Sequence, residues 1–212
     1  MLSKNPIFII GFPRSGTTLL QSLFLTQSNV YSLPETHYFC YIMNYFEYDI
    51  NGKIKPSCLG LVFKLIKEKI DLEINNDDKV FLIEKCNKKN LSIKFFFEFI
   101  VKKMIKDEVG DKLMSDIIWV EKTPGHIKNI NFIHSLYPEA RFVFIIRNPL
   151  NAIASYKKNF KKNIRRTHLA HKWKGSVDLF LNFQKKYPNN SILLRYEDLI
   201  SKNDKSHFKL VC

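Results

Sequence analysis

A short apolar run that ends in glycine, followed by a loop of small and hydroxylated residues, constrains this chain more than any other feature. Residues 6–11 read Pro-Ile-Phe-Ile-Ile-Gly, which predicts a strand buried on both faces, as in a parallel sheet. Residues 17–26 have the spacing of a helix. Between such elements a loop exposes successive backbone N–H groups, and the helix directs the positive end of its dipole to the same point. The arrangement predicts a site for a phosphate group.

The loop itself, residues 11–18, reads Gly-Phe-Pro-Arg-Ser-Gly-Thr-Thr. Its glycines allow the backbone to approach an anion closely, and its hydroxyl groups and arginine add donors. The alternative is a purely structural turn from strand to helix. The residues expected to contact a phosphate are Arg14, Ser15, Gly16, Thr17 and Thr18.

The same loop departs from the Walker pattern, in which a lysine reaches the outer phosphates of a nucleoside triphosphate. Thr17 stands in the place of that lysine, and Arg14 is the cation inside the loop. An ATPase or kinase is therefore disfavoured. A nucleotide with a single 5′-phosphate that carries a further group fits better.

Strand and helix patterns alternate along the rest of the chain. Apolar runs predict strands at residues 116–120, 141–146 and 191–194, while residues 79–86 suit either a helix or a strand. Helical spacing occurs at residues 61–72, 93–109, 124–137, 149–159 and 168–187. The alternation predicts an α/β fold: a three-layer parallel β-sheet flanked by helices, of the P-loop nucleotide-binding type. A length of 212 residues predicts one domain over residues 1–212.

Composition narrows the kind of partner and compartment. Lysine and arginine number 34 against 20 acidic residues, and a net charge of +14 attracts anions, although a solvated basic surface is the simpler alternative. Four cysteines occur without a CxxC pair, which argues against a zinc site or a disulfide framework. No apolar run approaches the roughly 20 residues of a membrane span. We therefore expect a cytoplasmic protein with free thiols and no transmembrane segment.

A second anion site is predicted at Arg147, directly after the strand at residues 141–146. Ligands of open α/β sheets collect at the carboxyl ends of strands, and a guanidinium offers a forked donor suited to phosphate. Ser155 follows eight residues later in the next helix. The alternative is an arginine that forms a salt bridge at the edge of the sheet.

Together these segments resemble motifs of the sulfotransferases that use 3′-phosphoadenosine 5′-phosphosulfate (PAPS). The loop resembles their 5′-phosphosulfate-binding loop, most closely that of the tyrosylprotein and bacterial carbohydrate-type branch, and Arg147 with Ser155 resembles their 3′-phosphate motif. Residues 119–126 and 194–199 resemble the EKTP and RYEDL segments, so the resemblance extends over residues 5–200. Family members usually continue further, and we expect either a compact or a C-terminally truncated member.

This resemblance implies transfer of a sulfuryl group from PAPS to a hydroxyl acceptor by in-line displacement, with 3′-phosphoadenosine 5′-phosphate (PAP) as product and no metal. The acceptor is a carbohydrate, a peptide tyrosine or a small molecule. Arg147 and Ser155 are expected to hold the 3′-phosphate, and Tyr196 is expected to lie against adenine. A core aromatic is the alternative for Tyr196.

The chemistry needs cations beside the leaving phosphate and a base for the acceptor proton. Arg14 and Lys122 are the predicted cations, and the alternative for Lys122 is a pair with Glu121 or a surface amine. Glu35 is the predicted base, because residues 33–37 resemble a segment of the tyrosylprotein branch; the alternative is a carboxylate in the first turn of a helix or a surface salt bridge. The second and third choices of base are histidines, His37 and then His126.

For the binding of the acceptor, the main feature of the sequence is a cluster of basic residues. Residues 157–174 carry eight lysines or arginines, and residues 148–177 contain no acid. This basic rim is expected to attract PAPS or an anionic acceptor, or it is simply a solvated helix surface. His168 and His171 have no evident third ligand, so we expect a solvated helix face and no metal.

Two other functional classes compete with a sulfotransferase. One is a P-loop nucleotide kinase or NTPase, and the other is a catalytically degenerate module that binds nucleotides or polyanions. Nucleic acid is not expected as a partner, because no stacking platform interleaves with the basic residues. The sequence does not indicate an oligomeric state.

Overall fold

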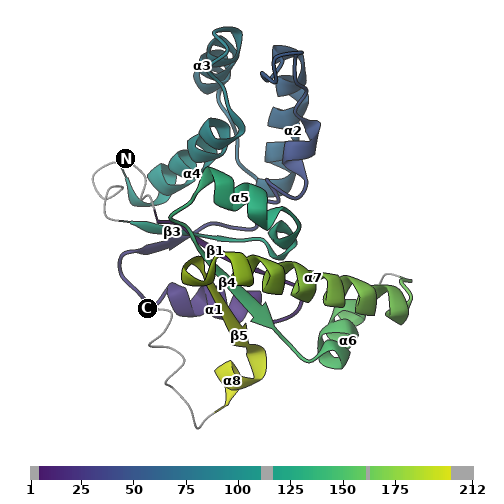
Figure 1. Cartoon of the computed structure of the whole chain (residues 1–212). Helices are drawn as coiled ribbons and strands as arrows, with labels where there is room; N and C mark the ends of the chain where they lie inside the picture. Colours follow the sequence, from purple (N-terminus) through teal and green to yellow (C-terminus); the bar gives the residue numbers. More distant parts are fainter. Residues whose placement is uncertain (1–4, 111–116, 161–162, 202–212) are drawn as a thin grey trace. The chain divides into compact units, whose positions relative to one another are not determined.

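The computed structural model describes residues 5–110, 117–160 and 163–201 (Figure 1). By their contacts, these residues divide into two compact units. Residues 5–32 and 118–201 form what we call the sheet unit, and residues 33–110 with residue 117 form the helical unit. Each unit is described by itself.

Five parallel strands form the centre of the sheet unit, in the order β2-β3-β1-β4-β5. They are β1 (Ile7–Gly11), β2 (Val30–Ser32), β3 (Ile118–Lys122), β4 (Arg141–Ile146) and β5 (Ser191–Arg195). The helices of this unit are α1 (Thr17–Phe24), η4 (Pro124–Asn129), α5 (Ile130–Leu136), α6 (Pro149–Phe160), α7 (Arg166–Lys186), η5 (Pro188–Asn190) and α8 (Tyr196–Ile200).

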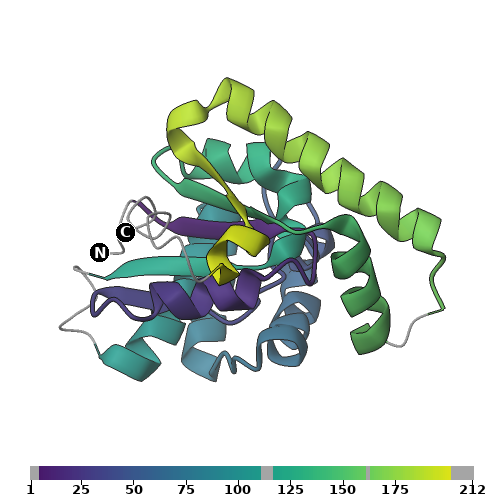
Figure 2. The same cartoon turned by 90° about the horizontal axis from the view of Figure 1, so that it is seen from below.

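Successive residues of β4 point to opposite faces of the sheet, as the period of a strand requires. Val143 and Ile145 pack with residues of α1 in one core cluster. Phe142 and Phe144 contact rings of α7 on the other face: the Phe144 and Phe180 ring centres are 4.7 Å apart. Figure 2 shows α1 and α7 on opposite sides of the strands. The predicted three-layer fold is confirmed, with β1 at its centre.

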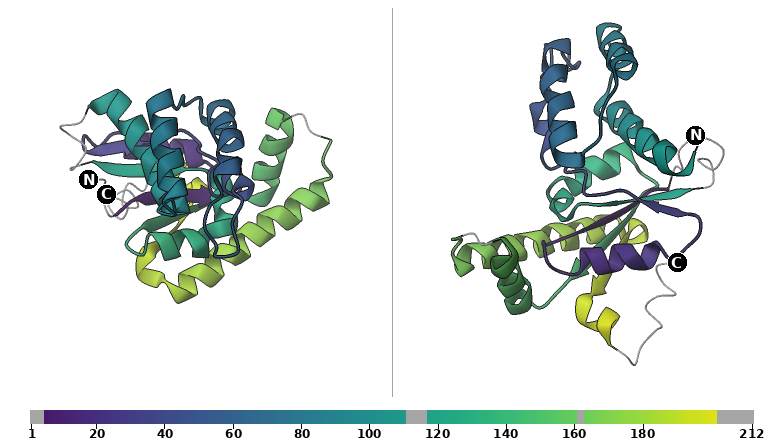
Figure 3. Two further views of the ribbon diagram at one scale, coloured as in Figure 1. Left: turned by 90° about the horizontal axis from the view of Figure 1, so that it is seen from above. Right: turned by 180° about the vertical axis from the view of Figure 1, so that it is seen from behind.

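The helical unit contains η1 (Ile42–Tyr45), η2 (Pro56–Cys58), α2 (Leu59–Ile70), α3 (Asn76–Asn87) and α4 (Ile93–Val109), which Figure 3 shows from above and from behind. Its core is aromatic. The Tyr38 ring lies 4.7 Å from that of Phe97, and Phe46 lies 5.2 Å from Phe96. The buried phenylalanines of this unit are Phe39, Phe46, Phe63, Phe96 and Phe97.

Most predicted elements are present with small shifts of their ends. Residues 79–86, which suited either a helix or a strand, lie in α3, where the Asn75 side chain caps the helix by accepting the N–H of Asp78 at 2.8 Å. The single helix expected at residues 124–137 is divided into η4 and α5. The predicted strand at 116–120 begins at residue 118; residue 116 itself lies outside the described residues. Several short elements were not predicted, namely β2, α8, η1, η2 and η5.

Within the described ranges, no three His, Cys, Asp or Glu side chains come together in a group that could hold a metal ion. None of the helices described combines the length and the apolar character that crossing a bilayer requires. Cys40, Cys58 and Cys86 are free thiols.

Candidate active site at the carboxyl edge of the sheet

The predicted phosphate loop follows β1 and leads into α1. Arg14 and Gly16 have φ angles of 71° and 103°, and the Ser15 N–H donates to the Phe12 carbonyl at 3.2 Å. Within the described residues, α1 has no capping hydrogen bond from a side chain and no acid in its first turn. The backbone N–H groups at its start are therefore available to an anion.

Gly16 is packed too tightly to be replaced. A Cβ atom added there would fall 2.9 Å from Cε2 of Tyr196 and nearer still to Cδ2 of the same ring. Tyr196 is the first residue of α8 and the tyrosine of the RYEDL segment. The tertiary structure thus brings this distant segment onto the phosphate loop.

Arg147 joins the same group from the end of β4. Its Nη1 donates to the carbonyl oxygen of Arg14 at 3.1 Å, and its guanidinium carbon lies 4.3 Å from the centre of the Tyr196 ring. The backbone around Arg147 is held in turn. Trp173 Nε1 donates to the Arg147 carbonyl at 3.1 Å, and the neighbouring Asn148 N–H donates to Glu197 at 2.9 Å. Sequence reasoning did not single out these supporting residues, although Glu197 lies in the RYEDL segment.

The two predicted anion sites meet at a side-chain contact. Arg14 Nε donates to Ser155 Oγ at 3.3 Å, so the arginine of the loop contacts the serine of the second motif. Nearby, Ser15 Oγ and Arg147 Nε are buried atoms without a hydrogen-bond partner among the described residues. Buried polar atoms normally have partners, because leaving one unpaired costs about 1–3 kcal/mol. These donors suit an anion with several oxygen atoms.

The end of β3 holds a buried carboxylate, that of Glu121, with its hydrogen-bonding partners. The Glu121 carboxylate accepts hydrogen bonds from Thr123 N at 3.1 Å and Thr123 Oγ1 at 2.6 Å, and His126 Nδ1 lies 2.8 Å from its Oε2. The side chains of Glu121 and His126 are completely buried. The residues that engage this carboxylate, Thr123 and His126, follow Lys122 in the chain. Glu121 was not predicted to be a buried anchor.

Lys122 itself is 6% exposed and ends β3, with its Cα paired to Ile9 on β1. The β3 strand therefore places the predicted lysine beside the strand that leads into the phosphate loop. Thr17 is buried in the first turn of α1, and Thr18 is exposed there. Arg14 is exposed as well.

Glu35 and His37, the first two choices of base, belong to the helical unit. His37 Nε2 lies 3.6 Å from Glu35 Oε2, and both side chains are partly exposed, at 41% and 37% respectively. His37 has a φ of 50°, in the left-handed region that a non-glycine residue seldom adopts. The two candidates thus form a partly exposed ion pair, which is also the structural alternative considered for Glu35.

A comparison with protein-family models decides the family. The model described as "Sulfotransferase family" matches residues 6–211. This chain belongs to the sulfotransferase family. Solved structures of sulfotransferases share this fold. The sulfotransferase domain of the curacin biosynthetic pathway has a TM-score of 0.60 at 22% identity, with 99% of this chain and 73% of that chain covered. The sulfotransferase domain of the Synechococcus PCC 7002 olefin synthase gives 0.64 at 18%, with 99% and 75% covered.

The curated relatives that match this chain are much longer proteins. An uncharacterized protein of Aquifex aeolicus is 26% identical over 160 residues, which is 74% of this chain and 18% of that protein. Nodulation protein NoeE of Sinorhizobium fredii is 24% identical over 150 residues, which is 71% of this chain and 30% of that protein. The match of this chain therefore spans less than a third of the length of either relative.

Within the sheet unit, the residues predicted to bind the nucleotide form one group. Five of them are linked by contacts around the start of α1: Arg14, Gly16, Arg147, Ser155 and Tyr196. The predicted bases are divided, since His126 lies in the sheet unit while Glu35 and His37 lie in the helical unit.

Proposed function

We propose that this sulfotransferase transfers a sulfuryl group from PAPS to the hydroxyl group of an acceptor and releases PAP. The observation that carries the proposal is the pair of buried, unpartnered donors among the described residues, Ser15 Oγ and Arg147 Nε, one in each predicted anion site. The contact between Arg14 and Ser155 supports it, because it makes the two sites neighbours. The prediction of one sulfotransferase domain over residues 1–212 is kept as part of the proposal.

The nucleotide would be held by two sets of residues. The 5′-phosphate would be bound by the loop and first helical turn, at Arg14, Ser15, Gly16, Thr17 and Thr18. The 3′-phosphate would be bound by Arg147 and Ser155, where a guanidinium can donate through two N–H groups. Tyr196, whose ring centre lies 4.3 Å from the guanidinium carbon of Arg147, would lie against the adenine.

When bound, PAPS supplies an activated sulfuryl group. Arg14 and Lys122 would stabilise the negative charge that develops on the leaving phosphate. Glu35 would take the proton of the acceptor hydroxyl, with His37 as the second choice. His126, whose Nδ1 lies 2.8 Å from Glu121 Oε2, is the third choice. No metal is required in this scheme.

Calorimetric binding of PAP, 5′-AMP and Mg²⁺–ATP to the full chain tests the donor class. We expect PAP to bind without metal and about tenfold or more tightly than 5′-AMP, because the 3′-phosphate adds charge-assisted hydrogen bonds. Preference for Mg²⁺–ATP would instead support a kinase or NTPase. Equal binding of PAP and 5′-AMP, or binding of neither, would contradict the proposal.

A further inference from the structure

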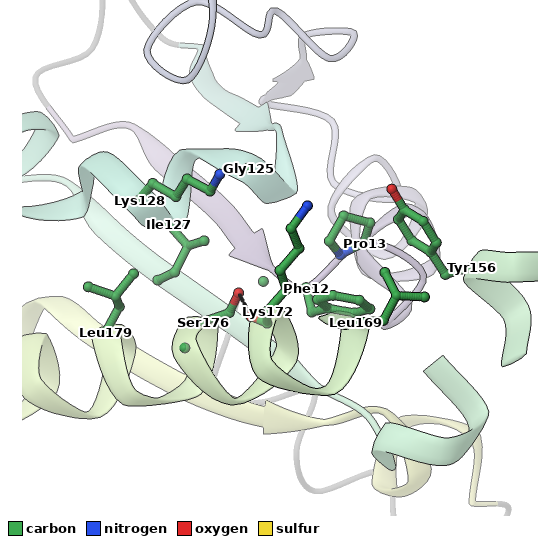
Figure 4. A pocket seen from close by; sticks show the side chains of 12 residues that line it. Phe12, Pro13, Gly125, Ile127, Lys128, Tyr156, Leu169, Lys172, Ser176 and Leu179 are labelled. Atoms are coloured by element: carbon green, nitrogen blue, oxygen red, sulfur yellow. Dashed lines mark hydrogen bonds between the residues drawn. The ribbon is translucent and has the colours of Figure 1, made fainter. Parts of the chain in front are cut away.

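A pocket opens beside the phosphate loop on the side of α7 (Figure 4). It has a volume of about 420 Å³, within the range of small-molecule sites. Three segments of the sheet unit form most of its wall. These are the loop residues Gly11, Phe12 and Pro13; the η4 residues Gly125, Ile127 and Lys128; and the α7 residues Leu169, Lys172, Gly175, Ser176 and Leu179.

The wall of the pocket is mainly apolar and firmly packed. Phe12 and Leu169 are buried and belong to one core cluster, and Tyr156 packs on them with its ring 5.8 Å from that of Phe12. Leu179 is 39% exposed, so the apolar wall continues out to solvent. Exposed apolar surface of this kind, rimmed by polar groups, is typical of a binding site.

Two lysines, Lys128 and Lys172, line the pocket together with the apolar residues. Lys128 comes from η4 and Lys172 from α7, on opposite sides of the pocket, and in Figure 4 the side chain of Lys172 rises from α7 toward Pro13. No aspartate or glutamate is among the residues that line the pocket. A ligand with an apolar body and a negative charge would match this wall.

The pocket is separate from the group proposed to bind the nucleotide. Arg14, Arg147, Ser155 and Tyr196 are not among its lining residues. Tyr156, which follows Ser155 in the chain, does line the pocket. Pro13, however, directly precedes Arg14. The pocket therefore adjoins the loop without using the side chains that would hold the phosphates.

We infer that this pocket binds the body of an amphipathic acceptor: an aromatic or alkyl compound with a hydroxyl group and a carboxylate, phosphate or sulfate. The apolar body contacts Phe12, Ile127 and Leu169, and the anionic group pairs with Lys128 and Lys172. The inference rests on the proposed function, and it selects a small amphipathic molecule from the acceptor classes considered above.

Fluorescence titration with 6-hydroxy-2-naphthoate tests the pocket, with 2-naphthol as the neutral counterpart. We expect the carboxylate to bind about tenfold more tightly than 2-naphthol, because it adds a charge-assisted contact. In the presence of saturating PAP, the affinities for both probes should stay within about twofold of their values without PAP, since the side chains proposed to bind the phosphates do not line the pocket. Equal binding of the two probes, or displacement by PAP, would overturn the inference.

Variants of α7 locate the binding. A Cβ atom added at Gly175 meets no atom within 4 Å, so a larger side chain can enter open space there. Gly175→Phe should weaken both probes by about tenfold or more by filling the pocket, while Gly175→Ala should change them by less than about threefold. Unchanged binding in Gly175→Phe would overturn the inference.

The charge is tested by Lys128→Gln and Lys172→Gln, which together should reduce the preference for the carboxylate to about twofold or less. Lys185 is an exposed α7 lysine outside the pocket, and Lys185→Gln removes one positive charge, as each of the two pocket substitutions does. This control variant should keep the preference for the carboxylate over 2-naphthol. If Lys185→Gln also lost the preference for the carboxylate, the net positive charge of the protein would explain that preference, and the inference would be contradicted. PAP binding, measured on every variant, reports separately on the proposed function.

Discussion

The ring of Tyr196 lies directly against the backbone of Gly16, where a Cβ atom would fall 2.9 Å from Cε2 of the ring and nearer still to Cδ2. Gly16 also has a φ of 103°, which disfavours any side chain. The phosphate loop and the RYEDL segment are thus fitted to each other at a glycine. Arg147 lies over the same ring and holds the Arg14 carbonyl, so one contact network supports both predicted anion sites.

Gly16→Ala should lower the free energy of unfolding by about 2–5 kcal/mol, the sum of backbone strain and overpacking against Tyr196. It should also weaken PAP binding by tenfold or more, because the loop must move. Denaturant unfolding and calorimetry measure the two effects. Gly52→Ala is the matched control: its φ is 71°, but a Cβ there meets no atom within 4 Å, so only about 1–2 kcal/mol of strain is expected. Equal losses would remove the contact with Tyr196 as the cause.

Arg147→Ala should weaken PAP binding by about 100-fold, because a buried, charge-assisted contact to a phosphate is lost. Binding of 5′-AMP should fall much less, through the loss of the hydrogen bond to the Arg14 carbonyl. Arg147→Lys should recover only part of the PAP affinity, since an ammonium lacks the forked donor. The exposed Arg166 supplies a control substitution, Arg166→Ala. Similar losses for PAP and 5′-AMP in Arg147→Ala would remove the arginine from the 3′-phosphate site.

Glu35→Gln should reduce turnover by about 100-fold or more and leave PAP affinity nearly unchanged, as expected for the loss of a general base. His37→Gln should have a smaller effect if the histidine only pairs with Glu35, from which it lies 3.6 Å. Steady-state kinetics with an accepted hydroxyl compound provides the measurement. Full turnover in Glu35→Gln would move the assignment of the base to His37 or His126.

Glu121→Ala should lower the free energy of unfolding by about 3–5 kcal/mol, because it removes a completely buried carboxylate that accepts two hydrogen bonds from Thr123 and contacts His126. Glu121→Gln tests the charge with little change of shape. An exposed pair offers the comparison: Glu84→Gln, whose carboxylate lies 3.9 Å from Lys88 Nζ, should cost less than about 1 kcal/mol. Denaturant unfolding separates the cases, and a loss in Glu121→Ala no larger than in Glu84→Gln would show that Glu121 does not anchor this turn.

The stability of the sheet unit should fall as the solution becomes mildly acidic. Burial, with a smaller contribution from Lys186, lowers the pKa of His134, whose ring lies 3.9 Å from the ring of Tyr187. Below the ordinary histidine pKa of about 6.5, the unfolded chain therefore takes up a proton before the folded chain does, and stability is lost. Thermal unfolding between pH 5 and 7.5 should show a weaker pH dependence in His134→Phe. An unchanged slope in that variant would exclude His134 as the source.

The sequence by itself determined the elements whose patterns are local. The apolar run that ends at Gly11 and the run at residues 141–146 were recognisable because a strand buried on both faces needs continuous apolar residues. The loop between β1 and α1 was recognisable because its glycines and hydroxyl groups are adjacent in the chain. In contrast, β2 has three residues, too few to show a period, and residues 79–86 gave no decisive period either.

Only the tertiary structure decided which of these segments touch. The sequence placed Arg14 and Ser155 in separate motifs, whereas parallel pairing of β1 with β4 brings their side chains to 3.3 Å. It also marked Lys122 for chemistry and overlooked Glu121, because a local pattern does not reveal that the Glu121 carboxylate is completely buried against Thr123 and His126. Burial and contact depend on residues far apart in the chain, and parallel strands place the ends of such distant segments at one edge of the sheet.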